Sequence, residues 1–143
     1  MFPNFYPTQN ETISISEYYE FQTNVILPNK NISGKIKIIN QLHEFLNLNE
    51  NWDSYGAQPL NKKTIEKAIE VVNVLDRNNI EVYYTAPSPS GDILLESRMR
   101  NKILEIEILV DDKITFTAYE NDDVFKSGNL IESDYDIINW FLS

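Results

Sequence analysis

The 143-residue sequence predicts a single α+β domain, with two helices before an antiparallel sheet and one helix after it. Apolar residues recur at helical spacing between residues 35 and 75 and then switch to a period of two between residues 81 and 119. A last apolar stripe at helical spacing closes the chain at residues 134–142. The predicted fold is therefore an antiparallel four- to five-stranded meander with two helices before it and one C-terminal helix packed on it.

Residues 1–33 are predicted to form an extended N-terminal arm. Aromatic and polar residues are mixed there without clear periodicity, and Pro3, Pro7 and Pro28 interrupt them. The alternative is one short strand, over residues 12–15 or 23–27, that leads into the domain. The arm offers a route to a homo-oligomer, and the α+β domain is expected over residues 34–143.

Three helices follow from the apolar spacing. The first is expected over residues 35–46, where the apolar residues share one face: Ile38, Ile39, Leu42, Phe45 and Leu46. The second is expected to start after the N-cap Asn61 and to end at Asn78-Asn79, because asparagine tolerates the left-handed conformation common beyond helix ends. The third is expected over residues 134–142, behind the N-cap Ser133.

Four strands are expected, at residues 81–85, 92–97, 103–110 and 114–119. The register around Asp111-Asp112-Lys113 can be tested, because opposed residues of an antiparallel pair face the same side of the sheet. A two-residue loop would place Ile108 opposite Thr115, whereas a three-residue loop places Ile108 opposite Phe116 and keeps apolar residues together. We therefore predict a three-residue loop whose third residue, Lys113, is left-handed.

Composition excludes several classes of function. The chain has no cysteine, so disulfides, thiolate metal sites and cysteine nucleophiles are excluded. Its formal charge is −10, and residues 104–136 carry ten acidic side chains against two lysines, which accounts for −8 of that total. This charge repels phosphate backbones and favours a basic protein partner, so no direct nucleic-acid contact is expected. With neither a signal-like start nor a long apolar run, the sequence predicts a soluble cytoplasmic protein with no membrane contact.

The first candidate site is the segment NWDSYGAQPL, residues 51–60. Trp52 and Tyr55 combine large apolar bodies with polar tips, Asp53 can accept backbone N–H groups, and Gly56 permits a positive φ. Two interpretations remain open. In a packed corner, which we predict, Trp52 is buried against the second helix with its indole N–H bonded to a backbone carbonyl, and Asp53 is partly exposed. In a binding loop, Trp52, Asp53 and Tyr55 contact a partner.

Three glutamates form the second candidate site. If Ile93 pairs with Ile108, Glu96 lies opposite Glu105, with Glu107 on the same face. Like charges in direct opposition destabilise a sheet unless other groups offset them. The offset could come from basic side chains folding back across the face, namely Arg98, Arg100 or Lys102. It could also come from a basic partner or a divalent cation, although no ligand loop of the EF-hand type accompanies the glutamates and no metal site is assigned.

Catalytic chemistry finds little support in the sequence. The only histidine, His43, has no serine or cysteine near it in sequence with which to form a dyad. No catalytic residue and no cofactor is therefore assigned.

The order of these segments resembles a group of small uncharacterised bacterial proteins. NWDSYGAQPL, NKKTIEKAIEVV, PSPSGDILLE and LEIEI match that group's N-W-D-x-Y-G-A-x-P segment, its helix and its later P-x-x-x-G-x-I-x-L-E and L-E-I-E-I strands over residues 48–108. The resemblance implies an α/β fold with an antiparallel sheet. It also implies small single-domain proteins in mobile, prophage or toxin–antitoxin-like surroundings. Ser97 departs from the pattern, since the group usually places a tryptophan after L-E.

Two functions from different classes follow. The first is a non-enzymatic acidic interaction module that binds a basic or amphipathic protein partner, as an antitoxin-like or phage-defence-associated neutralising protein would. The second is a small metal-dependent hydrolase or nucleotide-processing enzyme that uses Asp53, Glu96, Glu105 or Glu107 around a divalent cation. They differ in whether the carboxylates converge, because a shared cation needs several oxygen ligands within direct reach.

Overall fold

The computed structural model describes residues 30–130 and 135–143 of the chain. Its elements run in the order α2 (Lys30–Glu44), the short 3-10 helix η1 (Phe45–Asn47), α3 (Lys62–Arg77), β1 (Tyr84–Pro87), β2 (Ile93–Met99), β3 (Lys102–Ile108), β4 (Ile114–Glu120), β5 (Asp123–Asn129) and α4 (Tyr135–Leu142). The five strands form one antiparallel sheet in the order β1-β2-β3-β4-β5. The predicted α+β meander is confirmed. The strand expected within residues 12–27 and the N-cap Ser133 lie outside the described residues.

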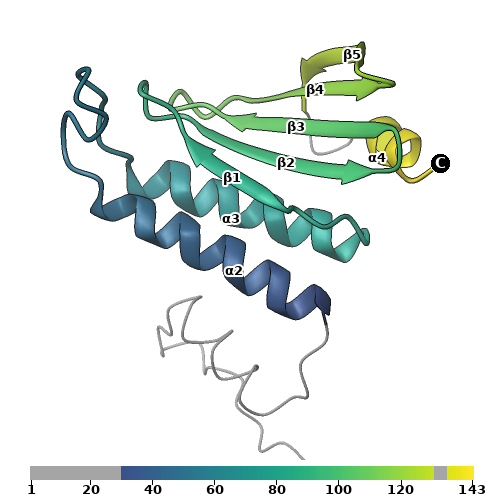
Figure 1. Cartoon of the computed structure of the whole chain (residues 1–143), viewed down its shortest axis with the longest axis horizontal. Coiled ribbons are helices and arrows are strands. Elements are labelled where there is room, and N and C mark those ends of the chain that lie inside the picture. Colours follow the sequence, from purple (N-terminus) through teal and green to yellow (C-terminus); the bar gives the residue numbers. More distant parts are fainter. Residues whose placement is uncertain (1–29, 131–134) are drawn as a thin grey trace, which may run out of the picture.

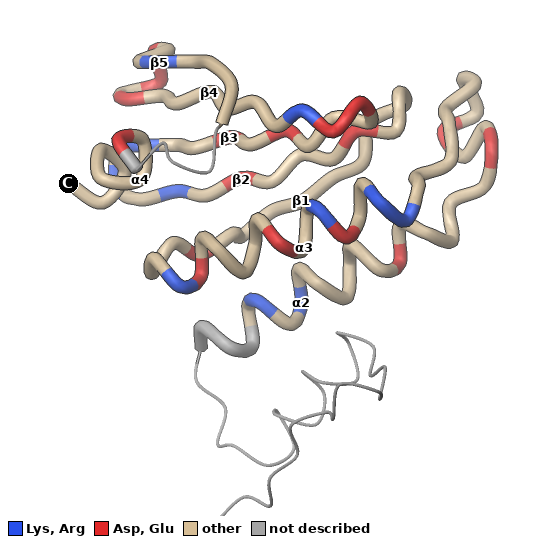
Figure 2. Tube along the Cα trace, turned by 180° about the vertical axis from the view of Figure 1, so that it is seen from behind, with Lys and Arg blue, Asp and Glu red and all other residues tan. Residues whose placement is uncertain are grey.

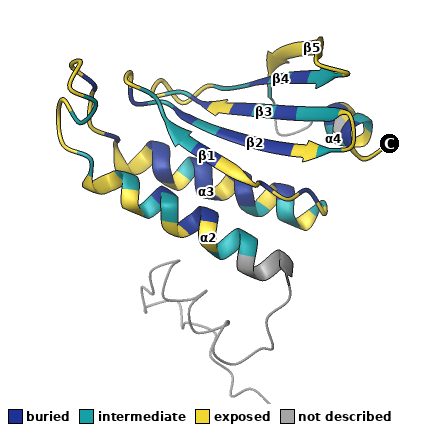
Figure 3. Cartoon of the chain, in the orientation of Figure 1, coloured by how far each residue is buried: buried dark blue, intermediate teal, exposed yellow. Residues whose placement is uncertain are grey.

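The described helices lie on one side of the sheet (Figure 1). α2 and α3 run side by side beneath β1, β2 and β3, and α4 packs at the end of β3 on the same side. Figure 3 shows the buried residues in the layer between helices and sheet. The largest fully buried side chains of this core are Ile38, Ile39, Leu42, Ile65, Ile69, Ile80, Ile93, Leu95, Leu104, Ile106, Ile108 and Phe141. The opposite side of the sheet carries no described helix.

α3 forms where its caps predict it. Asn61 Oδ1 accepts a hydrogen bond from the Thr64 backbone N–H at 2.7 Å, and Asn79 beyond the helix end has φ 61°. Both expectations for this helix are confirmed. α2 begins at Lys30 rather than at residue 35. The helical pattern in the sequence does not extend past Gly34, which is a weak helix former, but the helix itself continues through this residue. Within the described residues, no helix is long and apolar enough to cross a membrane.

The predicted three-residue loop before β4 is right in length and one residue too late. Ile108 pairs with Ile114 rather than with Phe116, so the loop comprises residues 110–112. Asp112 is the left-handed residue, at φ 71°, in place of the lysine that follows it. Aspartate tolerates this conformation better than lysine does. The register moves by two residues, which leaves every side chain on its predicted face.

β5 is the element that the sequence pattern missed. All seven of its residues are exposed, so its sequence has no period of two. A β-bulge at Ala118 and Tyr119 leaves Phe125 without a partner in the ladder. The ring of Phe125 instead stacks on Trp140 of α4, with centroids 4.9 Å apart and planes 6° from parallel. A bulge of this kind redirects a side chain, and here it joins the edge strand to the last helix.

Leu95 and Leu94 allow a matched test of the one-sided core. Leu95 is 1% exposed on the helix-facing side, and Leu94 is half-buried on the other side of the same strand. Leu95→Ala should lower the free energy of unfolding by about 2–5 kcal/mol, because it leaves a cavity in the core. Leu94→Ala should cost clearly less. Chemical denaturation of both variants measures the difference, and equal losses would contradict the assignment of faces.

Candidate functional site

The loop over residues 51–58 is held by its own polar groups. Asp53 Oδ1 accepts hydrogen bonds from the backbone N–H groups of Tyr55 at 2.8 Å and Ala57 at 3.0 Å. Asn51 Oδ1 accepts from the Gly56 N–H at 2.7 Å, and Gly56 has φ 89° as expected. The predicted partial exposure of Asp53 is confirmed. Its carboxylate stabilises the turn.

Trp52 does not occupy the predicted place. Its indole N–H donates to the Gln58 carbonyl oxygen at 2.9 Å, which confirms the expected hydrogen bond. The side chain is half-buried rather than buried, and it is not among the described hydrophobic residues packed on the core. The carbonyl that accepts its N–H belongs to Gln58, so this bond ties the side chain to its own loop. Tyr55, in the same loop, is 92% exposed.

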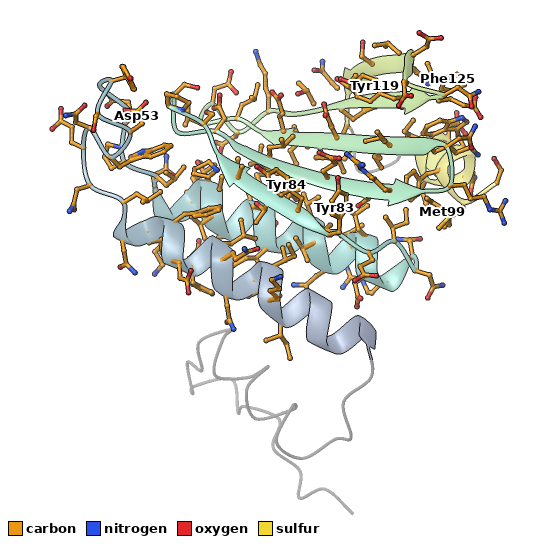
Figure 4. All side chains as sticks on the ribbon, in the orientation of Figure 1. Asp53, Tyr83, Tyr84, Met99, Tyr119 and Phe125 are labelled. Carbon is orange, nitrogen blue, oxygen red and sulfur yellow. The ribbon has the colours of Figure 1, made fainter. Side chains whose placement is uncertain are left out.

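The loop and the glutamates lie in different places. The loop is tied to the turn between β1 and β2 by a hydrogen bond from the Gln58 N–H to the Pro89 carbonyl oxygen at 2.8 Å. Figure 4 shows Asp53 at this end of the molecule, with Tyr83 and Tyr84 at the start of the edge strand β1 and Tyr119 toward the far end. The candidate residues Trp52, Asp53 and Tyr55 therefore do not join the glutamates in one site.

The side of the sheet that faces away from the helices holds the second candidate site, and we name it the open face. The predicted opposition of Glu96 and Glu105 is confirmed, and Tyr84 of β1 is the partner of Glu96 on its other side. The alternation along the strands places the following residues on the open face: Tyr84, Leu94, Glu96, Arg98, Ile103, Glu105, Glu107, Thr115, Thr117 and Tyr119.

Glu96 is the carboxylate of the open face whose negative charge is balanced within the chain, by Arg98. Its side chain is only 11% exposed and accepts a hydrogen bond from Arg98 Nε at 3.0 Å. Tyr83 Oη also donates to it, and the Arg98 guanidinium lies 5.3 Å from the centroid of the Tyr83 ring. Burial and the bond to Glu96 raise the pKa of the Tyr83 hydroxyl. The expected return of Arg98 across the face is thus confirmed, whereas the part played by Tyr83 is new.

Glu105 and Glu107 are compensated differently. Tyr119 Oη donates to Glu105 Oε2 at 3.1 Å. Within the described part of the chain, no lysine or arginine lies within ion-pair distance of either glutamate. Burial, the bond to Glu105 and the negative charges of Glu105, Glu107 and Glu96 raise the pKa of Tyr119. The open face therefore has a centre of negative charge beside an aromatic ring.

The two other predicted basic side chains leave the open face. Lys102 lies on the helix side, where its Nζ donates to the Trp140 carbonyl oxygen at 2.6 Å and to Ser143 Oγ at 2.9 Å. Arg100 is exposed in the turn between β2 and β3, with φ 58°. Of the three cations expected as alternatives, only Arg98 therefore folds back across the glutamates. The strand alternation turns Lys102 toward the helices, and the tight turn takes Arg100 out of the sheet. Figure 2 shows how charges of both signs are distributed over the helices and strands.

Comparison with protein-family models, curated proteins and solved structures found no match for the chain. The resemblance to the small bacterial group therefore stays a prediction. Ser97, where the chain departs from that group, is 2% exposed and pairs with Leu104 on the helix-facing side. The departure thus affects the core and not the open face.

Asp53 and Tyr55 test the internal bonding of the loop. Asp53→Ala removes the acceptor of two backbone N–H groups, and the free energy of unfolding should fall by about 1–2 kcal/mol. Tyr55→Ala removes a side chain that is 92% exposed and should leave the melting temperature nearly unchanged. Thermal melts compare the two, and an unchanged melt for Asp53→Ala would show that the carboxylate does not stabilise the turn.

Tyr119 should make the fold sensitive to alkaline pH. Its pKa is raised in the folded chain, so the folded state keeps a proton that the unfolded state loses above pH of about 10. This contribution to stability is full below that pH and is lost as pH rises through the folded pKa. Denaturation at stepped pH should show a shallower alkaline loss for Tyr119→Phe, and some loss should remain because the pKa of Tyr83 is raised too. An identical slope in both proteins would contradict the prediction.

Proposed function

We propose that this protein is a non-enzymatic interaction module that binds a basic protein partner through the open face. The observation that carries the proposal is the state of Glu105 and Glu107. They lie beside Tyr119 on a sheet face without a described helix, and no described cation pairs with them. A face of this kind offers a partner both charge and aromatic surface.

The chemistry suits arginine and lysine side chains. A carboxylate forms charge-assisted hydrogen bonds with either cation, and an aromatic ring attracts a cation placed over its face. Arg98 uses this combination within the chain, on Glu96 and Tyr83. A basic side chain of the partner would repeat it at Glu105 and Tyr119. Because Glu105 is only partly exposed, water would weaken that contact less than it weakens a contact on an open surface.

The charge of the chain supports the same partner at longer range. Residues 104–136 hold −8 of the formal −10, and this stretch includes most of β3 and all of β4 and β5. A concentrated negative field speeds the encounter with a basic partner and disfavours acidic ones. An antitoxin-like or phage-defence-associated protein in the cytoplasm, neutralising a basic partner, is the biological setting that the resemblance suggests.

No observation favours the metal-dependent hydrolase. Asp53 is bonded within its own loop, while Glu96 and Glu105 are bonded to Arg98 and Tyr119. In residues 30–130 and 135–143, no three histidine or acidic side chains come together in a way that could hold a metal ion. The carboxylates named for that function therefore do not form a common site.

A pair of double variants tests the proposal. Glu105→Gln/Glu107→Gln removes two charges from the open face and nearly preserves side-chain shape. Glu44→Gln/Glu66→Gln removes two charges from exposed positions on α2 and α3. The tagged proteins are used for pull-downs from the native host at low and high salt, with captured proteins identified by mass spectrometry. A basic protein should be captured by the natural sequence and by the helix variant, and lost with the open-face variant.

The salt series separates electrostatic binding from other binding. At about 0.5 M salt the screening length falls to a few ångströms, so capture by the natural sequence should weaken strongly. Capture that survives the Glu105→Gln/Glu107→Gln change, or that is lost equally in both double variants, would remove the open face from the function.

A further inference from the structure

The helix side of the sheet contains an apolar groove that the proposed function does not use. It has a volume of about 500 Å³, larger than the cleft of about 190 Å³ beside Lys35 and Asp76. Its floor is the inner face of β3 and β4, and its walls are α3 and α4. The apolar lining consists of Val71, Val74, Leu75, Leu104, Ile106, Ile114, Leu130, Ile137 and Ile138. The volume falls within the roughly 300–1,000 Å³ of small-ligand sites, which are likewise mainly apolar with a few polar groups.

The polar groups of the groove carry a net positive charge. Among the described lining residues, the charged side chains are the cations Lys67 and Arg77 and the carboxylate Glu70. Their formal net charge is +1, in a chain whose total formal charge is −10. All three belong to α3, and Lys67 and Arg77 are separated by about 15 Å along the helix at 1.5 Å per residue. An elongated ligand is therefore needed to use the apolar lining and one of the cations together.

The two cations differ in how far they are already engaged. Lys67 Nζ lies 3.4 Å from the Asp112 carbonyl oxygen, in a corner where Asp112 also pairs with Lys63 at 2.6 Å. Arg77 is exposed, and no described carboxylate lies within ion-pair distance of it. A guanidinium can hold a carboxylate through two parallel hydrogen bonds, which a lysine cannot do. The Arg77 end is thus the better place for an anion.

We propose that the groove binds a single-chain amphiphile with an anionic head group, of the class of long-chain carboxylates. The carboxylate lies at Arg77, and the tail runs along α3 over Val74 and Val71 toward Ile114. Burial of the tail supplies most of the affinity, since removing apolar surface from water is favourable in proportion to the area buried. The head group sets the direction. This site is on the opposite side of the sheet from the open face, so it can be tested independently of the protein partner.

The probe is laurate, titrated into the full chain below its micelle concentration. Methyl NMR follows Ile106, Ile114 and Ile138, which line the groove, and calorimetry gives the affinity. Dodecyltrimethylammonium, with the same tail and a cationic head, is the matched ligand. Laurate should shift the three methyl signals and bind at least about tenfold more tightly than the cation binds in the groove.

Two charge reversals on one helix locate the head group. Arg77→Glu should weaken laurate about tenfold or more, while Lys67→Glu, with the same change of charge on the same groove, should weaken it only about two- to threefold. Circular dichroism checks that each variant is folded. If Arg77→Glu is not folded, Val74→Asp serves instead, because Val74 is 40% exposed and a carboxylate there enters the path of the tail. That variant should also abolish the methyl shifts.

The outcomes that overturn the proposal are distinct. No binding of laurate, or binding without shifts of the three methyl signals, removes the groove as its site. Equal shifts from laurate and dodecyltrimethylammonium would show that the groove binds the apolar tail alone and does not recognise the anionic head group. A larger loss from Lys67→Glu than from Arg77→Glu rejects the assigned head-group position.

Discussion

The period of two in β2, β3 and β4 is the constraint on which the rest of the structure depends. Leu95, Ile106 and Phe116 are buried on the side of the sheet that faces the helices. Their neighbours along each strand must therefore face the other way. A slip of one residue would bury glutamates and expose the core, and burying an uncompensated charge costs far more than a sheet pair gains. The acidic open face is thus a geometric consequence of the core. Whatever binds there meets side chains that the core holds in register.

Much of this fold could be predicted because burial leaves a period in the sequence. α3 has both an apolar stripe and polar caps, and the strands around Ile93 and Ile108 alternate clearly enough to fix their pairing. For the loop before β4, the sequence predicted only the length of the loop and the face on which each strand residue lies. Its position depends on which residue takes the left-handed conformation, and Asp112 takes it in the structure. β5 could not be predicted from a period of two, since an edge strand that is exposed along its whole length has no buried face and therefore no alternation of apolar residues.

The candidate site was harder to predict than the core, for a physical reason. Opposition of Glu96 and Glu105 follows from register alone. The hydroxyl groups that bond to them come from Tyr83 and Tyr119, which lie thirteen and fourteen residues away in sequence. Such contacts depend on side-chain rotamers and on strand twist, which no short pattern contains. Trp52 shows the same limit, because its hydrogen bond to the Gln58 carbonyl was expected from the residue types but its partial exposure was not.

The stacking of Phe125 on Trp140 has a consequence for how the molecule opens. Trp140 is held on one side by a ring from β5, and the Nζ of Lys102 from β3 lies 5.1 Å from its ring centroid. α4 therefore cannot detach without breaking contacts to both the edge strand and the start of β3. Proteins open in cooperative units, and we expect the ring contact between Phe125 and Trp140 to couple the opening of β5 to that of α4. Their amide hydrogens should exchange with solvent together, and a change at either element should be felt at the other.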